Sequence, residues 1–110
     1  MTYNKTAVFI ETTLFTSLVA KYLSADEYGE LQQYLMAYPD SGSVIRGSGG
    51  IRKLRWSRRG TGKLGGVRTI YYWAKPLDQI YMLTMYSKSE RANIDDATLA
   101  RIAKHLGYIR

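Results

Sequence analysis

The spacing of apolar residues changes from a helical period to a strand period near residue 43. Before that point, residues 6–10 have the β-branched and aromatic composition of a first strand, and residues 12–23 place apolar side chains at helical spacing. Ser24 and Glu27 then have the spacing of a capping box, which predicts the start of a second helix. The apolar face of that helix is predicted to consist of Tyr28, Leu31, Leu35 and Tyr38.

After Pro39, which ends the second helix, apolar residues alternate with polar ones. Residues 43–46 predict a short strand, and residues 51–56 (IRKLRW) predict a longer one. Because side chains alternate across a strand, its two faces are predicted to differ. One face is expected to carry Ile51, Lys53 and Arg55, and the other Arg52, Leu54 and Trp56.

Two further strands and a helix complete the predicted order. Residues 67–74 (VRTIYYWA) follow a glycine-rich loop, and residues 80–86 (IYMLTMY) are almost continuously apolar, which favours a central position in the sheet. Asn93 is predicted to cap a C-terminal helix that ends near Gly107. The buried stripe of this helix is predicted to be Leu99, Ile102, Ala103 and Leu106. The order predicts an α+β fold, and 110 residues fit a single domain, residues 1–110.

The composition indicates the cellular location of the protein and excludes disulfides and some kinds of metal site. The chain has no cysteine, so disulfides and thiolate metal sites are excluded, and one histidine argues against a zinc site. The apolar run before Glu11 is too short for a signal peptide, and no stretch has the length of a membrane helix. The predicted location is therefore the cytoplasm, with no membrane association.

The formal net charge of +7 is concentrated in one third of the chain. Nine cations and no anion lie between Asp40 and Asp78, whereas the rest of the chain is slightly acidic. The nine are Arg46, Arg52, Lys53, Arg55, Arg58, Arg59, Lys63, Arg68 and Lys75. Such a cluster indicates a polyanionic partner, either nucleic acid or an acidic protein or membrane surface.

Two common kinds of phosphate chemistry do not fit this basic segment. A P-loop needs Ser or Thr after its lysine, but Leu64 follows Lys63, and Ser57 stands at the first glycine position. The segment also has no carboxylate to hold magnesium. Four acidic residues elsewhere occupy helix starts or helix surfaces, where they complement the helix dipole. These are Glu27, Glu30, Asp95 and Asp96.

Metal-free cleavage of RNA remains compatible with the Lys, Arg and Tyr side chains. RNA carries its own nucleophile, the 2′-hydroxyl, so a protein needs to align the attack, stabilise the growing charge and assist proton transfers. Arginine suits the phosphate charge, lysine with a lowered pKa suits proton transfer, and tyrosine can orient the hydroxyl or stack on a base. The alternative is a basic face that binds RNA without cutting it, and composition does not separate the two.

Three segments resemble a known family when they are taken together. They are GxGGIRKLR over residues 47–55, GKLGGVRTIYY over residues 62–72, and the motif Tyr86-x-Lys88-x-Glu90. With the element order, they resemble the RelE superfamily of toxins from type II toxin-antitoxin systems, most closely its HigB branch. The resemblance implies two N-terminal helices and a C-terminal helix packed on a twisted, mainly antiparallel sheet of about four to five strands.

The resemblance also implies an activity and a site. Members of the family cleave mRNA in the ribosomal decoding site by 2′-hydroxyl attack, without metal or other cofactor. The matching positions imply that Arg55 and Arg68 stabilise transition-state charge, and that Lys53 contributes charge or proton transfer. Tyr86 and Lys88 are implied to orient the nucleotide or transfer a proton. Contacts to RNA are expected from Arg52, Arg58, Arg59, Lys63 and Tyr72.

The chain departs from the family pattern at one place. Some members have a tyrosine or histidine base near the C-terminal helix, where this chain has the residues ANIDD, so the general base is not assigned. His105 could substitute only if the helix end folds back towards the sheet.

The partners implied by the resemblance are a cognate antitoxin with a helix-turn-helix DNA-binding domain, the 30S A site of the ribosome, and mRNA. Operator DNA would be bound only through the antitoxin complex. The runner-up function is a non-catalytic nucleic-acid-binding module or regulator that uses the same basic face. A purely structural interaction domain would leave the acid-free run of cations unexplained.

Overall fold

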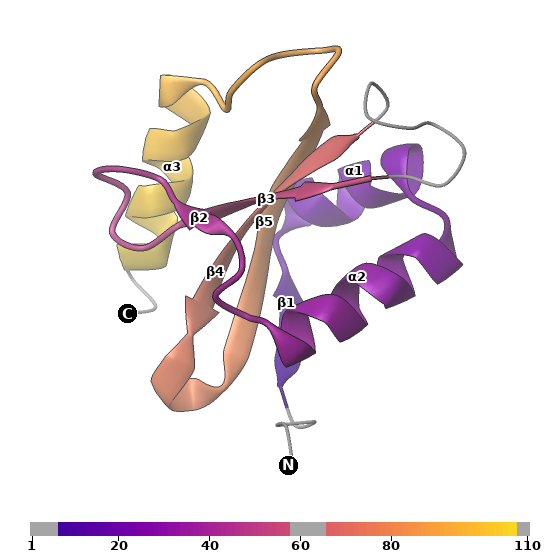
Figure 1. The fold of residues 1–110 in the computed structure, drawn as a ribbon. Coiled ribbons are helices and arrows are strands. Elements are labelled where there is room, and N and C mark those ends of the chain that lie inside the picture. The colour runs from indigo at the N-terminus through magenta and orange to yellow at the C-terminus, as the bar shows by residue number, and fades with distance from the viewer. Residues whose placement is uncertain (1–6, 58–65, 108–110) are drawn as a thin grey trace.

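The computed structural model describes residues 7–57 and 66–107, which form one mixed sheet with helices on both faces (Figure 1). The strand order is β1-β5-β4-β3-β2. β1 runs parallel to β5, and the other neighbouring strands are antiparallel. The strands are β1 (Val8–Glu11), β2 (Ser43–Val44), β3 (Arg52–Trp56), β4 (Val67–Ala74) and β5 (Gln79–Ser87). The predicted α+β fold, with its central last strand, is confirmed.

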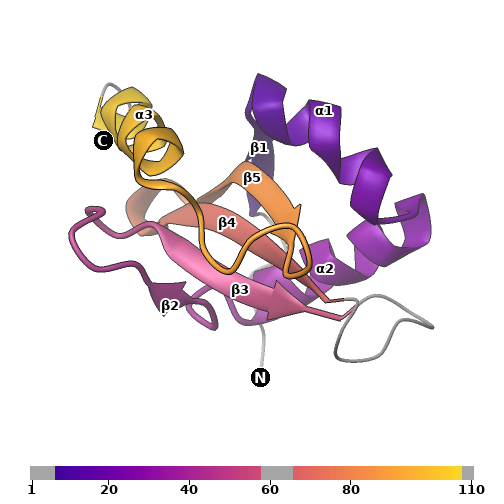
Figure 2. The ribbon, with the colours of Figure 1, turned by 90° about the horizontal axis from the view of Figure 1, so that it is seen from above.

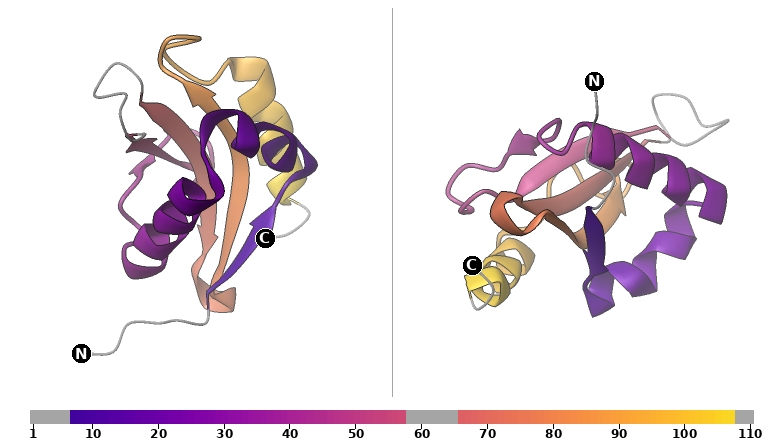
Figure 3. Two further views of the ribbon diagram at one scale, coloured as in Figure 1. Left: turned by 90° about the vertical axis from the view of Figure 1, so that its right-hand side faces the viewer. Right: turned by 90° about the horizontal axis from the view of Figure 1, so that it is seen from below.

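Helices α1 (Thr13–Tyr22) and α2 (Ala25–Ala37) cover one face of the sheet, and α3 (Asp96–Gly107) covers the other (Figure 2). A short 3₁₀ turn, Lys75–Leu77, joins β4 to β5, and the resulting hairpin lies between the two helical layers (Figure 3). No helix in the described part of the chain is long and apolar enough to span a membrane.

Local signals explain where the first two helices begin. Thr12 caps α1: its hydroxyl accepts a hydrogen bond from the Phe15 amide (3.0 Å) and donates one to the Leu83 carbonyl (2.7 Å). Ser24 and Glu27 form both hydrogen bonds of the predicted capping box at the start of α2. The bond to Leu83 also ties the start of α1 to the central strand.

The sheet separates two apolar layers. The layer under α1 and α2 includes Phe15, Leu31, Leu35, Val67, Tyr71, Met82 and Met85. The layer under α3 includes Ile51, Ile70, Leu83, Tyr86, Ile102 and Leu106. The alternation predicted for residues 51–56 is confirmed, because Ile51 belongs to the α3 layer whereas Leu54 and Trp56 pack against the other.

The pairing of β4 with β5 contains a β-bulge that the sequence pattern does not predict. Tyr71 pairs with Met82, whereas Ile70 pairs with Thr84, so Leu83 is an extra residue on β5. The bulge moves every later pair by one residue. Arg68 consequently lies opposite Tyr86.

Two sequence predictions about helix ends are wrong. Tyr38 does not lie on the buried face of α2, because it follows the last helical turn and is 57% exposed. Asn93 does not cap α3. Instead, the Asp95 carboxylate accepts a hydrogen bond from the Thr98 amide (2.6 Å), while the Asn93 side chain accepts one from Lys53 Nζ (3.2 Å).

A matched pair of glycine substitutions tests the packing beside β3. A Cβ at Gly42 would lie 2.8 Å from Tyr71 Cε1 and 2.9 Å from Tyr71 Oη, whereas one at Gly29 on α2 meets nothing within 4 Å. We expect Gly42→Ala to destabilise the protein by about 1–3 kcal/mol through overpacking. Gly29→Ala should stabilise it by about 0.5–1 kcal/mol, because alanine loses less backbone entropy. Urea unfolding measures both, and an unchanged midpoint for Gly42→Ala would contradict the packing described.

Candidate functional site

A row of polar side chains crosses the sheet on the face that carries α3. Arg55 on β3 pairs with Arg68 on β4, and Arg68 pairs with Tyr86 on β5. Residues that are directly opposite on antiparallel strands have Cβ atoms about 4.5–5.5 Å apart. Three of the five predicted catalytic residues therefore lie side by side, and we call them the Arg55–Arg68–Tyr86 row.

Two polar atoms of this row are buried without a hydrogen bond. Arg68 Nη1 is shielded from solvent and has no hydrogen-bond partner among the described residues, and Tyr86 Oη is shielded too and makes no hydrogen bond of ordinary geometry, although the Ile94 backbone amide acts on it. An unsatisfied buried polar group costs about 1–3 kcal/mol, and like charges directly opposite each other on a sheet are unfavourable. The burial of these two atoms, with Arg55 opposite Arg68, is therefore unfavourable. An anionic, hydrogen-bonding ligand would relieve both costs.

The Tyr86 hydroxyl remains protonated at neutral pH. Burial raises the pKa of Tyr86, and the Ile94 backbone amide and the guanidinium groups of Arg68 and Arg91 oppose that rise. The Arg91 guanidinium also lies over the Tyr86 ring, 6.0 Å from its centroid. Tyr86 is 4% exposed. Its hydroxyl is thus a neutral donor and acceptor beside two cations.

The two predicted catalytic lysines lie close to the row in the fold. Lys53 is on the same face of β3 as Arg55, two residues earlier, and its Nζ donates to Asn93 Oδ1 (3.2 Å). Lys88 is exposed and follows the end of β5, where its backbone amide donates to the Gly66 carbonyl (3.3 Å). Residues 88–95, which we call the β5–α3 connection, therefore adjoin Lys53 as well as Tyr86.

The predicted RNA-binding residues are more scattered. Arg52 lies on the opposite face of β3, and its Nη1 donates to the carbonyls of Asp40 (3.0 Å) and Gly42 (2.7 Å). Tyr72 is on the α3 face further along β4, where its ring centroid is 6.4 Å from that of Tyr81. Arg58, Arg59 and Lys63 lie outside the described residues. The fold therefore does not gather the described members of this set around the row.

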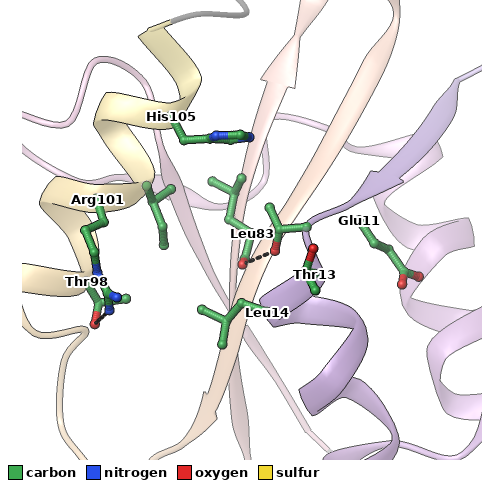
Figure 4. A pocket seen from close by; sticks show the side chains of 9 residues that line it. Glu11, Thr13, Leu14, Leu83, Thr98, Arg101 and His105 are labelled. Carbon is green, nitrogen blue, oxygen red and sulfur yellow. Dashed lines mark hydrogen bonds between the residues drawn. The ribbon is translucent and has the colours of Figure 1, made fainter.

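His105 belongs to a separate groove. This groove, of about 490 Å³, lies between α3 and the junction of β1 with α1 (Figure 4). Leu14, Leu83 and Ile102 contribute apolar lining, and none of the five predicted catalytic residues lines it. The described residues also contain no group of three His, Cys, Asp or Glu side chains that could hold a metal ion.

Comparison with known proteins identifies the family. The family model described as the RelE toxin of the RelE / RelB toxin-antitoxin system matches residues 43–109, which is more than half of the chain and includes all five predicted catalytic residues. The chain belongs to the RelE toxin family. The solved structure of a double arginine-to-alanine variant of E. coli toxin RelE, in the free state, has the same fold. The TM-score is 0.59 at 13% identity, covering 96% of this chain and 99% of the E. coli chain.

One structural feature beside the candidate site of this RelE-family chain is not evident from sequence spacing. The carboxylate of Glu90 accepts hydrogen bonds from the hydroxyl of Tyr22 and from the amide and hydroxyl of Ser87, and it forms an ion pair with Lys21 (3.4 Å). These donors, Tyr22 first, lower the pKa of Glu90 to about 2. The signal available in the sequence was the motif that ends at Glu90, but the partners on α1 are 68 and 69 residues away.

The pH dependence of stability tests this carboxylate network. Because the folded pKa of Glu90 lies below its ordinary value of 4.5, its stabilisation is present above that value and is lost as pH falls towards 2. We expect wild type to be more stable than Glu90→Gln at neutral pH, with the difference shrinking between about pH 5 and pH 2. Urea unfolding of both proteins across that range measures it. A difference that is the same at every pH would contradict the network.

Proposed function

We propose that this RelE-family chain is a translation-inhibiting toxin that cleaves mRNA on the ribosome, in the cytoplasm, through 2′-hydroxyl attack. The Arg55–Arg68–Tyr86 row carries the proposal, because two cations and a buried neutral hydroxyl converge there with two hydrogen-bonding atoms unused. A phosphodiester would supply negative charge to Arg68 and an acceptor oxygen to each of Arg68 Nη1 and the Tyr86 hydroxyl. The family match supports the assignment of the chain as a toxin.

The proposed reaction needs an aligned phosphate and two proton transfers. The 2′-oxygen bonds to the adjacent phosphorus as its proton leaves, the bond to the 5′-oxygen breaks, and that oxygen takes up a proton. The products are a 2′,3′-cyclic phosphate and a free 5′-hydroxyl. Arg55 and Arg68 would stabilise the charge that develops on the phosphoryl oxygens. Tyr86, protonated and buried, would donate a hydrogen bond or proton to an oxygen of the same group.

The lysines complete the proposed site. Lys53 Nζ hydrogen-bonds the Asn93 side chain, which fixes the ammonium on the face of the row. Lys88 follows Tyr86 by two residues and remains exposed, so it can contact the nucleotide from the end of β5. We assign Lys53 to charge stabilisation or proton transfer, and Lys88 to orientation of the nucleotide.

The proposed partners follow from the same site and the family description. The match to a toxin of the RelE / RelB system supports a cognate antitoxin for this chain. An acidic segment of that antitoxin would be attracted to the cations of the row, and a helix-turn-helix domain on the antitoxin would carry the complex to operator DNA. The ribosomal A site would supply the mRNA in an accessible, single-stranded form.

Replacing Arg68 tests the catalytic assignment. We expect Arg68→Ala to lower the rate of mRNA cleavage on programmed ribosomes by about 100-fold or more, because one fixed donor to the transition state is lost. Arg101→Ala, which removes an exposed arginine of α3 outside the row, is the matched control and should cleave like wild type. Cleavage is followed by primer extension, with folding checked by circular dichroism. Intact mRNA with wild-type protein would instead favour the non-catalytic RNA-binding alternative.

A second substitution separates the function of the Tyr86 hydroxyl from its contribution to stability. Tyr86→Phe removes a buried hydroxyl that makes no hydrogen bond of ordinary geometry, so the stability should stay the same or rise by about 1 kcal/mol. Cleavage should fall by about 10²- to 10⁴-fold if the hydroxyl transfers a proton. Thermal unfolding and the ribosome assay measure the two effects. A marked loss of stability with unchanged cleavage would assign Tyr86 to the core alone.

A further inference from the structure

The turn that follows β5 is held by hydrogen bonds to both the carbonyl and the amide of Ser87. The Ser87 carbonyl accepts hydrogen bonds from the amides of Glu90 (3.1 Å) and Arg91 (3.3 Å). In return, Glu90 Oε1 accepts from the Ser87 amide (3.1 Å) and hydroxyl (3.0 Å). Ser87 stands between Tyr86 and Lys88 in the chain. The Glu90 side chain therefore restrains the backbone that joins these two candidate catalytic residues.

The same carboxylate fastens this turn to the helical layer on the other face of the sheet. The hydroxyl of Tyr22, a buried residue at the end of α1, donates a hydrogen bond to Glu90 Oε1, and Lys21 Nζ lies 3.4 Å from Glu90 Oε2. α1 packs on β5 and is itself capped against the Leu83 carbonyl by Thr12. Glu90 is thus held by an element that belongs to the core and not to the candidate site.

Beyond Glu90, the β5–α3 connection passes to the site side of the sheet. Figure 2 shows it leaving the end of β5 and crossing in front of β3 before it reaches α3. On this path Arg91 lies over the ring of Tyr86, and Asn93 accepts the hydrogen bond from Lys53 Nζ. The position of the connection therefore affects two candidate catalytic side chains directly, and a third, Lys88, is part of it.

The contacts of Glu90 suit a carboxylate better than an amide. Oε1 accepts from three donors and Oε2 faces an ammonium, so both oxygens serve as acceptors. A glutamine has the same shape, but its amide nitrogen would present hydrogen atoms to Lys21 or to the Ser87 and Tyr22 donors. Replacement of Glu90 by glutamine should therefore loosen the turn without leaving a cavity.

We propose that Glu90 is a positioning residue for the candidate site: it anchors the turn after β5 to α1 and thereby holds Lys88, Arg91 and Asn93 in place around Tyr86 and Lys53. This inference rests on the proposed function. It assigns a role to the last position of the Tyr86-x-Lys88-x-Glu90 motif, which the row itself leaves unexplained. Glu90 acts through its neighbours and is not expected to touch the RNA.

The test compares Glu90→Gln with Tyr22→Phe, which removes one donor of the network, and with their double variant. Glu27→Gln is the control, since it makes the same change of charge and a glutamine still completes the capping box of α2. On saturating programmed ribosomes, kcat should fall about 10- to 100-fold in Glu90→Gln with KM unchanged, because misplaced groups lower the rate of the chemical step. The double variant should lose little more than Glu90→Gln alone, because both changes break one network.

Hydrogen exchange provides a readout that does not depend on activity. The Ser87 amide, which donates to Glu90, should exchange faster in Glu90→Gln than in wild type, whereas it should be unchanged in Glu27→Gln. If wild type does not cleave mRNA, the proposed function fails, and faster exchange still establishes the anchor. If wild type cleaves and Glu90→Gln cleaves equally fast despite the faster exchange, the positioning role is overturned. Unchanged exchange at Ser87 would overturn the anchor itself.

Discussion

The register of β4 on β5 is the constraint on which the candidate site depends. Without the extra residue at Leu83, the pairing of Tyr71 with Met82 would continue and place Met85, rather than Tyr86, opposite Arg68. The bulge reverses the faces of the residues that follow it, so Met85 packs under α1 and α2 while Tyr86 turns to the α3 side. One inserted residue thus places Met85 in the core under α1 and α2 and the Tyr86 hydroxyl at the candidate site.

The central position of β5 links the site to both halves of the core. Its side chains reach the two apolar layers, α1 is capped against its Leu83 carbonyl, and the turn at its end is bound to α1 through Glu90. A change that moves β5 would therefore disturb the Arg55–Arg68–Tyr86 row and the packing of both helical layers together. The rigidity that holds the row comes from the core, while two of the buried polar atoms without a hydrogen bond, Arg68 Nη1 and Tyr86 Oη, belong to the row.

Most of the elements could be predicted from the sequence, because short-range patterns determine them. The capping box at Ser24 and the alternation on β3 are local signals, and both are present in the structure. The bulge could not be predicted in this way. Residues 80–86 are apolar almost throughout, so a change of face leaves no trace in their pattern. The prediction of the α3 cap was wrong for a related reason. Asn93 and Asp95 are both good capping residues by type, and the side chain of Asn93 instead makes a tertiary contact with Lys53.

The bonds made by Glu90 and Asp95 explain why neither carboxylate satisfies Arg68. Glu90 is only four residues from Tyr86 in the chain, but its oxygens bind donors from Tyr22, Ser87 and Lys21 on the α1 side of the sheet. Asp95 is likewise occupied, by the Thr98 amide at the start of α3 and by Arg91. These bonds keep both acids from pairing with Arg68, whose Nη1 stays without a partner. Both acids that follow β5 most closely are thus bonded to other groups, so a ligand can supply the acceptor that Arg68 Nη1 lacks.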